Sequence, residues 1–373
     1  MLLAKMFFSI YNVMSLLLLN FVFEKEFSGN FLFLLSQFMF VATISRLGSD
    51  FYWSSGKVEK KIRVVKNEFR IHFAVCLLTT VIFLVVSPNL NHSDFLVCLF
   101  IFGSSNFMQL MGRHFQQHKK HITSLFLFTV GPTGISVPFL MIFDSLSVPV
   151  IVAMSNFCIC VPFIKHFYTN CDFEVEENGF FDRVSFLPML GFGMLNQHLI
   201  ALFSGLNSKH GEIAILVVFQ RMAGLISWPL VIFMQTNLHS LGTSVGAMKD
   251  FISTVKGFMS KFIPLIVILT LVSLTASCTF LYIEDNLSIM AIFSMLLITL
   301  GCLLNAIFAY VQYQMGVKRM TLELSLIILV AMLFSYYFYS IVNFSAASSF
   351  FIFHVLVHFS SIFCLVRKIK INE

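Results

Sequence analysis

The sequence predicts an all-α integral membrane protein with about twelve transmembrane helices in two six-helix lobes. Hydrophobic residues make up 58% of the 373 positions and charged residues only 11%, and the mean hydropathy is +0.89. Long apolar runs recur along the whole chain, and about 20 apolar residues are enough to cross a bilayer as a helix. A soluble domain of ordinary composition has far less apolar surface to bury.

Each span is expected where an apolar run is bounded by polar or charged residues. In chain order the expected spans cover roughly 6–23, 31–47, 72–90, 95–112, 121–143, 146–165, 186–206, 213–236, 262–283, 288–310, 321–342 and 346–366. The first run is not read as a signal peptide, because it lacks a clear small-residue cleavage site and further spans follow.

The distribution of Lys and Arg predicts the orientation. With the N-terminus in the cytoplasm, 21 of the 24 Lys and Arg residues fall on the inner side, and only Lys25 and Lys209 fall outside. Cytoplasmic segments carry such an excess of basic residues. Both termini are therefore expected in the cytoplasm. The net charge of +6 is accounted for by anionic membrane lipid, so no nucleic-acid partner is expected.

Loop lengths predict the domain organisation. All outside connections are short, and the longer loops lie inside, at about 48–71, 166–185 and 237–261. The middle loop is acidic and lacks apolar periodicity, which is typical of a connector. We therefore expect an N-terminal lobe over 1–168, a cytoplasmic linker over 169–185 and a C-terminal lobe over 186–373. Six spans on each side suggest a duplicated architecture.

The segment Ser45–Phe73 follows the second span and is rich in Lys and Arg. Its apolar residues, among them Leu47, Ile62 and Val65, can line one side of a helix while the basic residues occupy the others. This pattern is typical of a helix lying on the inner leaflet. A solvated cytoplasmic connector explains the same composition.

Motifs for catalysis, nucleotide hydrolysis and metal binding are missing from the sequence. It contains no Gly-rich phosphate loop, no H-E-x-x-H and no G-x-S-x-G, and its acidic residues fall almost entirely in loops. Of the eight cysteines, Cys158 and Cys160 come closest together, at a spacing that suits neither zinc nor redox chemistry. No catalytic residue, metal or cofactor is predicted, and any driving force would be a gradient or the disequilibrium of the substrate itself.

Arg221 is the only Lys or Arg that cannot be placed near a membrane surface, and it has apolar residues on both sides. A charge at the membrane centre costs about 2.5–3.5 kcal/mol on insertion scales, so it needs a partner or a wet cavity. Polar residues of other spans would line the same cavity. The candidate substrate-binding residues are Asn196, Gln197, His198, Gln220, Arg221, His354 and His358. The structural alternative is that the amides join helices and the histidines pack as neutral rings.

An arginine and several imidazoles facing one lumen would make that lumen cationic. Such a lumen suits an anionic passenger such as a pyrophosphate head group, because Arg binds phosphate in a bidentate manner. A cationic drug would instead require a carboxylate within the membrane, and no Asp or Glu lies near the centre of an expected span.

The chain resembles the polysaccharide-biosynthesis flippases of the multidrug/oligosaccharidyl-lipid/polysaccharide (MOP) exporter superfamily, in particular the O-antigen (Wzx-type) branch. The resemblance rests on the six-plus-six layout with both ends inside, on SRLGSDFYWSS at the end of the second span, and on the central pair of spans. That pair combines Asn196-Gln197, a short Gly hairpin and VVFQRMAGLISWPLVIFMQ. The layout covers the whole chain, and the local motifs cover about a fifth of it.

The resemblance implies a MATE/MOP-like protein of the bacterial inner membrane, with two lobes around a central cavity. It implies alternating access that moves an undecaprenyl-pyrophosphate-linked oligosaccharide from the inner to the outer leaflet, in lipopolysaccharide or other polysaccharide biosynthesis. Arg221 and His198 match best the cationic cavity positions of the family. Membrane lipid and other polysaccharide-assembly membrane proteins are the further partners to expect. Asn196-Gln197-His198 stands where some relatives have acidic or additional basic residues, which argues against a simple proton or sodium antiport scheme.

Three other functions remain open from the sequence. A drug or cation antiporter of the same superfamily requires an intramembrane carboxylate. A polytopic polysaccharide polymerase would be expected to carry a large external loop rich in Arg and His, whereas every outside connection here is short. A membrane O-acyltransferase would need a catalytic His near an early span.

Overall fold

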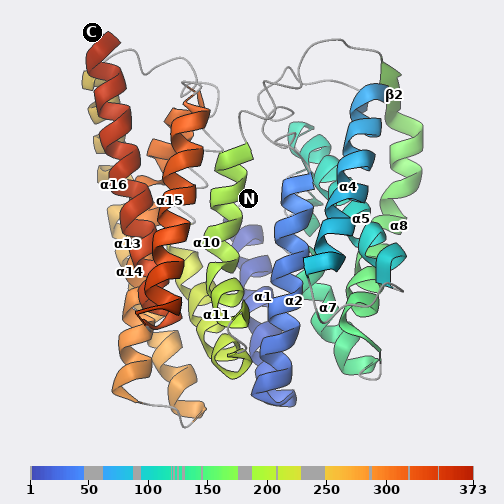
Figure 1. The fold of residues 1–373 in the computed structure, drawn as a ribbon, viewed down its shortest axis with the longest axis horizontal. Coiled ribbons are helices and arrows are strands. Elements are labelled where there is room, and N and C mark those ends of the chain that lie inside the picture. The colour runs from blue at the N-terminus through green and yellow to red at the C-terminus, as the bar shows by residue number, and fades with distance from the viewer. Residues whose placement is uncertain are drawn as a thin grey trace. The chain divides into compact units, whose positions relative to one another are not determined.

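A computed structural model gives the fold (Figure 1). It describes residues 2–45, 62–86, 94–118, 120, 122–123, 126–127, 131–143, 146–174, 187–206, 209–227, 248–284, 288–317, 320–342 and 344–372.

Twelve α-helices lie in this described part of the chain, and its contacts divide it into two compact units, Met1–Met194 and Leu195–Glu373. Unit 1 contains α1 (Leu2–Val22), α2 (Lys25–Ser45), α4 (Lys66–Val86), α5 (Phe95–Gln117), α7 (Gly131–Ile142) and α8 (Val148–Asn170). The division falls inside α10 (Leu187–Leu206). Unit 2 contains the rest of α10, with α11 (His210–Gly224), the 3-10 turn η3 (Leu225–Ser227), α13 (Met248–Ile283), α14 (Ile289–Val317), α15 (Thr321–Ser340) and α16 (Ala346–Asn372).

These helices correspond in order to the twelve expected spans. Seven of them contain a stretch long and apolar enough to cross a membrane, and two shorter apolar stretches lie at Ile10–Val22 and Phe73–Val85. The all-α membrane fold is thereby confirmed. α13 begins at Met248, well before the expected span at 262, because its first turns are helical but not apolar. The predicted lobe boundary at 169–185 stays a prediction, and most of that segment lies outside the described residues.

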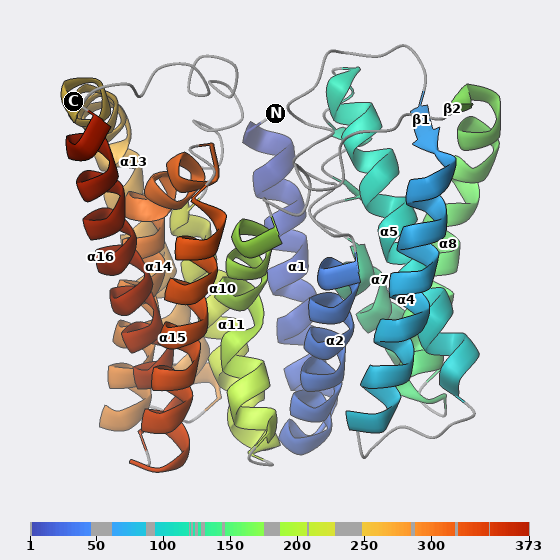
Figure 2. The same cartoon turned by 45° about the horizontal axis from the view of Figure 1, so that its top comes forward.

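Unit 1 is built around α5, which packs against α2, α4 and α8. Asn156 of α8 is fully buried and donates through Nδ2 to the Ser104 hydroxyl of α5 at 2.9 Å. Nearer the C-terminal ends of the same two helices, Met108, Met111 and Phe115 form an apolar cluster with Ile159. Within unit 1, successive helices run in opposite directions, and the turn between α1 and α2 lies at the end opposite to the strands described next (Figure 2).

Two short strands join the segments before α4 and after α8. β1 (Ile62–Val65) pairs in parallel with β2 (Cys171–Glu174), so that Ile62 is opposite Cys171 and Val65 is opposite Glu174. The expected leaflet-bound helix is therefore wrong for residues 62–65, because a run with three β-branched residues out of four favours extended backbone. The part of that prediction that concerns residues 46–61 lies outside the described residues.

Beyond the apolar core of α5, three histidines gather at the ends of two helices. His114 lies 4.4 Å from His118 and 5.5 Å from His166 of α8, measured between ring centroids. His114 lies past Gly112, where the apolar span of α5 ends. Burial, together with the charges of His118, His166 and Lys120, lowers the pKa of His114 to about 4.

This lowered pKa predicts acid sensitivity. Between pH 6.5 and about 4 the unfolded chain binds a proton at His114 that the folded chain does not, so stability present above pH 6.5 is lost as the pH falls. His114→Gln should reduce the acid-induced drop in Tm by about 2–4 °C for each kcal/mol of pH-dependent unfolding free energy that the substitution removes. Thermal unfolding from pH 7.5 to 4 would measure this, with His210→Gln as the control for loss of one imidazole. Identical pH profiles for His114→Gln and the unmodified chain would contradict the prediction.

Unit 2 is organised around α14, which packs against α16, α11 and α13, while α15 lies against α16. α10 joins this unit through Phe203, whose ring stacks on Tyr339 of α15 at 5.8 Å. α11 joins it through Phe219, which meets Phe280 of α13 edge-to-face at 6.1 Å.

Candidate functional site

Three consecutive polar residues of α10 were predicted to line one cavity. The structure gives them three different environments, because consecutive residues of a helix are about 100° apart around its axis. Asn196 is half-buried and Gln197 is exposed, whereas His198 is only 2% exposed. Asn196 and His198 lie on the packed sides of the helix, and Gln197 lies on the surface of unit 2.

Arg221 lies in the last turn of α11 and is half-buried. It follows His210, the first residue of that helix, by eleven positions, which places it about 17 Å along the axis at 1.5 Å per residue. For a helix that starts at the surface of a hydrocarbon core about 30 Å thick, this distance would reach close to the centre. The turn before α11 is tight: the Lys209 amide donates to the Ser204 carbonyl at 2.9 Å, and the Lys209 ammonium lies 5.7 Å from the Tyr339 ring centroid.

One hydrogen bond joins the polar residues of the two helices. The Gln220 side chain is 3% exposed, and its Nε2 donates to the backbone carbonyl of Asn196 at 2.7 Å. Gln220 therefore holds α11 against α10 beside Arg221. His198 lies close enough to Arg221 for the two to interact electrostatically. The predicted residues of α10 and α11, apart from exposed Gln197, thus meet at one helix pair.

Three enclosed polar atoms at this pair have no hydrogen-bond partner in the part of the chain that the structure describes. They are Oδ1 of Asn196, Oε1 of Gln220 and Nε of Arg221. Leaving a buried donor or acceptor unsatisfied costs about 1–3 kcal/mol, and more for a charged group. A polar ligand or water bound at this helix pair would supply the hydrogen-bond partners that these atoms lack, one of which belongs to a cationic group.

His354 and His358 belong to a different place in unit 2. Both are fully buried and stack on each other along α16, with ring centroids 5.5 Å apart and planes 20° apart. Gln312 of α14 approaches His358, with 2.9 Å between Gln312 Nε2 and His358 Nδ1. The structure places these two histidines inside the α14–α16 interface, and no described contact joins them to Arg221.

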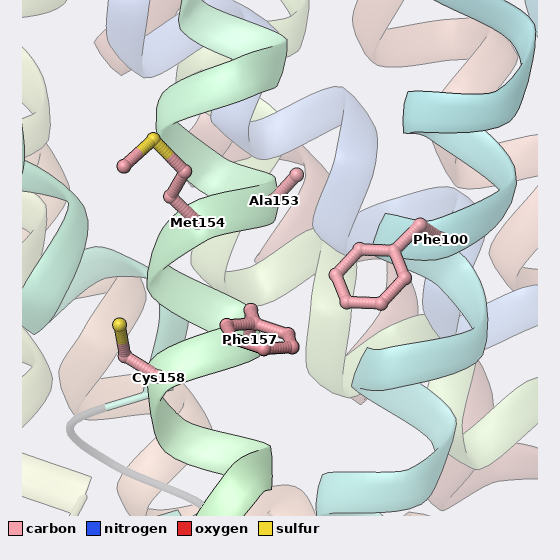
Figure 3. A pocket seen from close by; sticks show the side chains of 5 residues that line it. All are labelled: Phe100, Ala153, Met154, Phe157 and Cys158. Carbon is pink, nitrogen blue, oxygen red and sulfur yellow. The ribbon is translucent and has the colours of Figure 1, made fainter.

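A small hollow of about 260 Å³ lies between α5 and α8 and is lined only by Phe100, Ala153, Met154, Phe157 and Cys158 (Figure 3). Phe100 and Phe157 are 41% and 55% exposed. The lining carries no charged or hydrogen-bonding group beyond a thiol, so the hollow suits a lipid acyl chain and not a sugar or a phosphate. Sequence analysis did not find it, because exposed apolar residues are ordinary on a membrane helix.

No candidate metal site is present among the described residues, and seven of their cysteines are free thiols. Cys158 and Cys278 are exposed on the helices that carry them.

The fold and its apolar helices define a multi-pass membrane protein. No protein-family model matches the chain, and no curated protein matches it. Among solved structures, the crystal structure of a MATE in complex with MaD3S is similar over 99% of this chain and 96% of that chain, with 12% sequence identity and a TM-score of 0.44. A likeness this distant establishes neither family nor function.

Proposed function

We propose that this protein is a MOP-type flippase of the Wzx branch, which moves an undecaprenyl-pyrophosphate-linked oligosaccharide across the bacterial inner membrane by alternating access. It acts as a transporter and not as an enzyme. Its partners are the lipid-linked glycan, membrane lipid and other polysaccharide-assembly membrane proteins. Both termini face the cytoplasm, in keeping with the bias of Lys and Arg along the sequence.

The observation that carries this proposal is the α10–α11 pair. A guanidinium about 17 Å along a membrane helix has no ion-pair partner among the described residues. Its Nε is unsatisfied, as are the side-chain oxygens of Asn196 and Gln220 on the same helix pair. A permanently charged group at that depth favours a bound anion or a wet cavity. The amide oxygens accept hydrogen bonds, which suits the hydroxyls of a sugar next to a phosphate held by Arg221.

In this proposal Arg221 binds a pyrophosphate oxygen, and Asn196 and Gln220 accept hydrogen bonds from the glycan. His198 lies beside Arg221, and Gln197 contacts substrate from the exposed side of α10. His354 and His358 are too enclosed for direct contact with an oligosaccharide, so we assign them a different role below.

A deletion and complementation experiment tests the function. The gene is deleted, surface polysaccharide is followed, and the lipid-linked repeat unit is chased in separated leaflets. We expect single repeat units to accumulate on the inner leaflet and to reach the outer leaflet again when this chain alone is restored. Single units that reach the outer leaflet but do not lengthen would identify a polymerase and overturn the proposal.

A further inference from the structure

The buried histidines of α16 form one continuous hydrogen-bonded row with an amide of α14. Gln312 Nε2 lies 2.9 Å from His358 Nδ1, and His358 Nε2 lies 3.4 Å from His354 Nδ1. Both rings and Gln312 are at most 1% exposed. The row therefore consists of an amide and two imidazoles enclosed within the α14–α16 interface.

Hydrogen-bond chemistry assigns the protons of this row. A neutral imidazole has one N–H donor and one acceptor nitrogen. Because the Gln312 amide nitrogen donates to Nδ1 of His358, the proton of His358 is on Nε2 and is donated to Nδ1 of His354. His354 then carries its own proton on Nε2. In this arrangement both rings are neutral, and three of their four ring nitrogens take part in the hydrogen bonds of the row.

The same row can accept one further proton without losing a hydrogen bond. If His354 becomes an imidazolium, its Nδ1–H donates to Nε2 of His358. The proton of His358 then moves from Nε2 to Nδ1. After the Gln312 amide group has rotated by about 180°, this Nδ1–H donates to Oε1 of Gln312. That oxygen has no hydrogen-bond partner among the described residues. The row gains one N–H in total, and the direction of every hydrogen bond reverses. A second proton would make two cationic N–H groups face each other at 3.4 Å, so the capacity is one.

The surroundings of the row exclude ligands larger than a proton or a water molecule. The rings of Phe350 and Phe353 pack against His354 at 4.5 and 5.5 Å between centroids, and Phe308 lies 6.1 Å from His358. Gly301 of α14 has no side chain there, and a Cβ at this position would lie 3.2 Å from Cδ2 of His354. No pyrophosphate or sugar fits in this space.

Charged groups on the neighbouring helices lie away from the pair. α14 contains no Asp, Glu, Lys or Arg, and the one charged residue of α15, Glu323, is in its first turn and exposed. The charged residues of α13 precede Phe262, and those of α16 begin at Arg367. The remaining titratable side chains of these helices are thiols and phenols, of which Cys302 and Tyr339 are buried. Among the described residues of these four helices, His354 and His358 are the only histidines.

We propose that His354, His358 and Gln312 form a binding site for a single proton that couples a proton gradient to the movement of unit 2. This inference rests on the proposed transport function and names its coupling ion. A transporter without a nucleotide-binding motif can be driven by such an ion, and no Asp or Glu lies near the centre of an expected span to hold one. A charged imidazolium is unfavourable in apolar surroundings, so the enclosed arrangement is the proton-free one, and uptake of the proton favours an arrangement of unit 2 in which water reaches the row.

Proton binding is tested without any substrate. The full chain is placed in lipid nanodiscs with ¹⁵N-labelled histidine, and the ring nitrogens are followed by NMR from pH 8 to 4.5. Signals that disappear in either His354→Gln or His358→Gln belong to the pair. We expect these two rings to titrate together with the uptake of one proton. In Gln312→Leu both rings remain but the amide is lost. The titration midpoint should fall by up to about one pH unit, because the hydrogen bond of the amide to the charged row is stronger than its hydrogen bond to the neutral row.

His210→Gln serves as the control, since it removes a histidine at the far end of α11 and should leave the pair unchanged. Two rings that titrate independently, or that stay neutral over the whole range, would overturn the proposal. Gln312→Leu keeps both rings, so it gives a readout even if a histidine variant fails to fold.

Coupling is tested separately, by export of the lipid-linked repeat unit with and without an ionophore that dissipates the pH gradient. Export by the unmodified chain should stop when the gradient is removed, and His354→Gln should export at least tenfold more slowly at every gradient. Wild-type export by His354→Gln and His358→Gln would contradict coupling while leaving the flippase proposal intact. A coupled one-proton titration in a chain that moves no repeat unit would instead contradict the proposed function alone.

Discussion

Replacing Arg221 by alanine should abolish export of the lipid-linked repeat unit while leaving the amount of protein in the membrane unchanged. The guanidinium lies in the last turn of α11 with its Nε unsatisfied. If it binds a pyrophosphate, its loss removes a charge-assisted pair of hydrogen bonds, each worth about 1.5–3 kcal/mol. This corresponds to a loss of export of roughly 100-fold or more, because each 1.4 kcal/mol is a factor of ten. Export is measured by complementation, with membrane levels measured in parallel.

Two further variants test whether the effect of Arg221→Ala comes from the loss of phosphate binding. Arg221→Lys keeps the charge but loses the planar fork and should restore export only in part. Lys256→Ala removes an exposed cation of α13 and should export normally. If Arg221→Ala disappears from the membrane, the arginine is structural. Normal export by that variant would show that Arg221 does not contact the passenger.

Gly301→Ala should destabilise unit 2 by about 1–3 kcal/mol, the usual cost of overpacking a filled core. The added Cβ would lie 2.7 Å from Cε1 of Phe350, and Phe350 is itself fully buried. Neither side chain has free space, so α14 and α16 must separate. Gly301→Leu should prevent assembly of the unit. Denaturant unfolding in detergent measures the change in the free energy of unfolding.

The matched control is Gly257→Ala on α13, where nothing lies within 4 Å of the added Cβ. That variant should be neutral or more stable by up to about 1 kcal/mol, because alanine is the better helix former. Equal behaviour of the two variants would mean that the close packing between Gly301 and Phe350 is not maintained in the folded protein.

The positions of the helices could be predicted from the sequence because each must hide its backbone polar groups from lipid, and this forces long uninterrupted apolar runs. The ends of the helices could not be predicted in the same way. The helix that crosses at 262–283 begins at Met248, since helical backbone continues into amphipathic sequence after the membrane ends. The hydropathy pattern reports the lipid boundary and not the boundary of the helix.

The candidate site was predicted in part. The polar residues of α10 and α11 were recognised as one region, and Gln220 and Asn196 do meet. The different environments of Asn196, Gln197 and His198 follow from helix geometry, but which of them is buried depends on contacts with other helices. The cluster of His114, His118 and His166 was missed, because His166 reaches it from another helix and only the four-residue spacing of the first two is visible in the sequence.

The pairing of β1 with β2 was also missed, since the local sequence carries no signal for a partner so distant in the chain. Its mechanical consequence concerns the whole of unit 1. The ladder closes the chain into a ring that runs from β1 through α4, α5, α7 and α8 back to β2. A displacement of the N-terminal end of α4 is transmitted to the C-terminal end of α8 through the backbone hydrogen bonds of the two strands. The two helices must therefore tilt together. If unit 1 moves during transport, it would therefore move as a rigid body at this end, because α4 and α8 cannot separate where β1 pairs with β2.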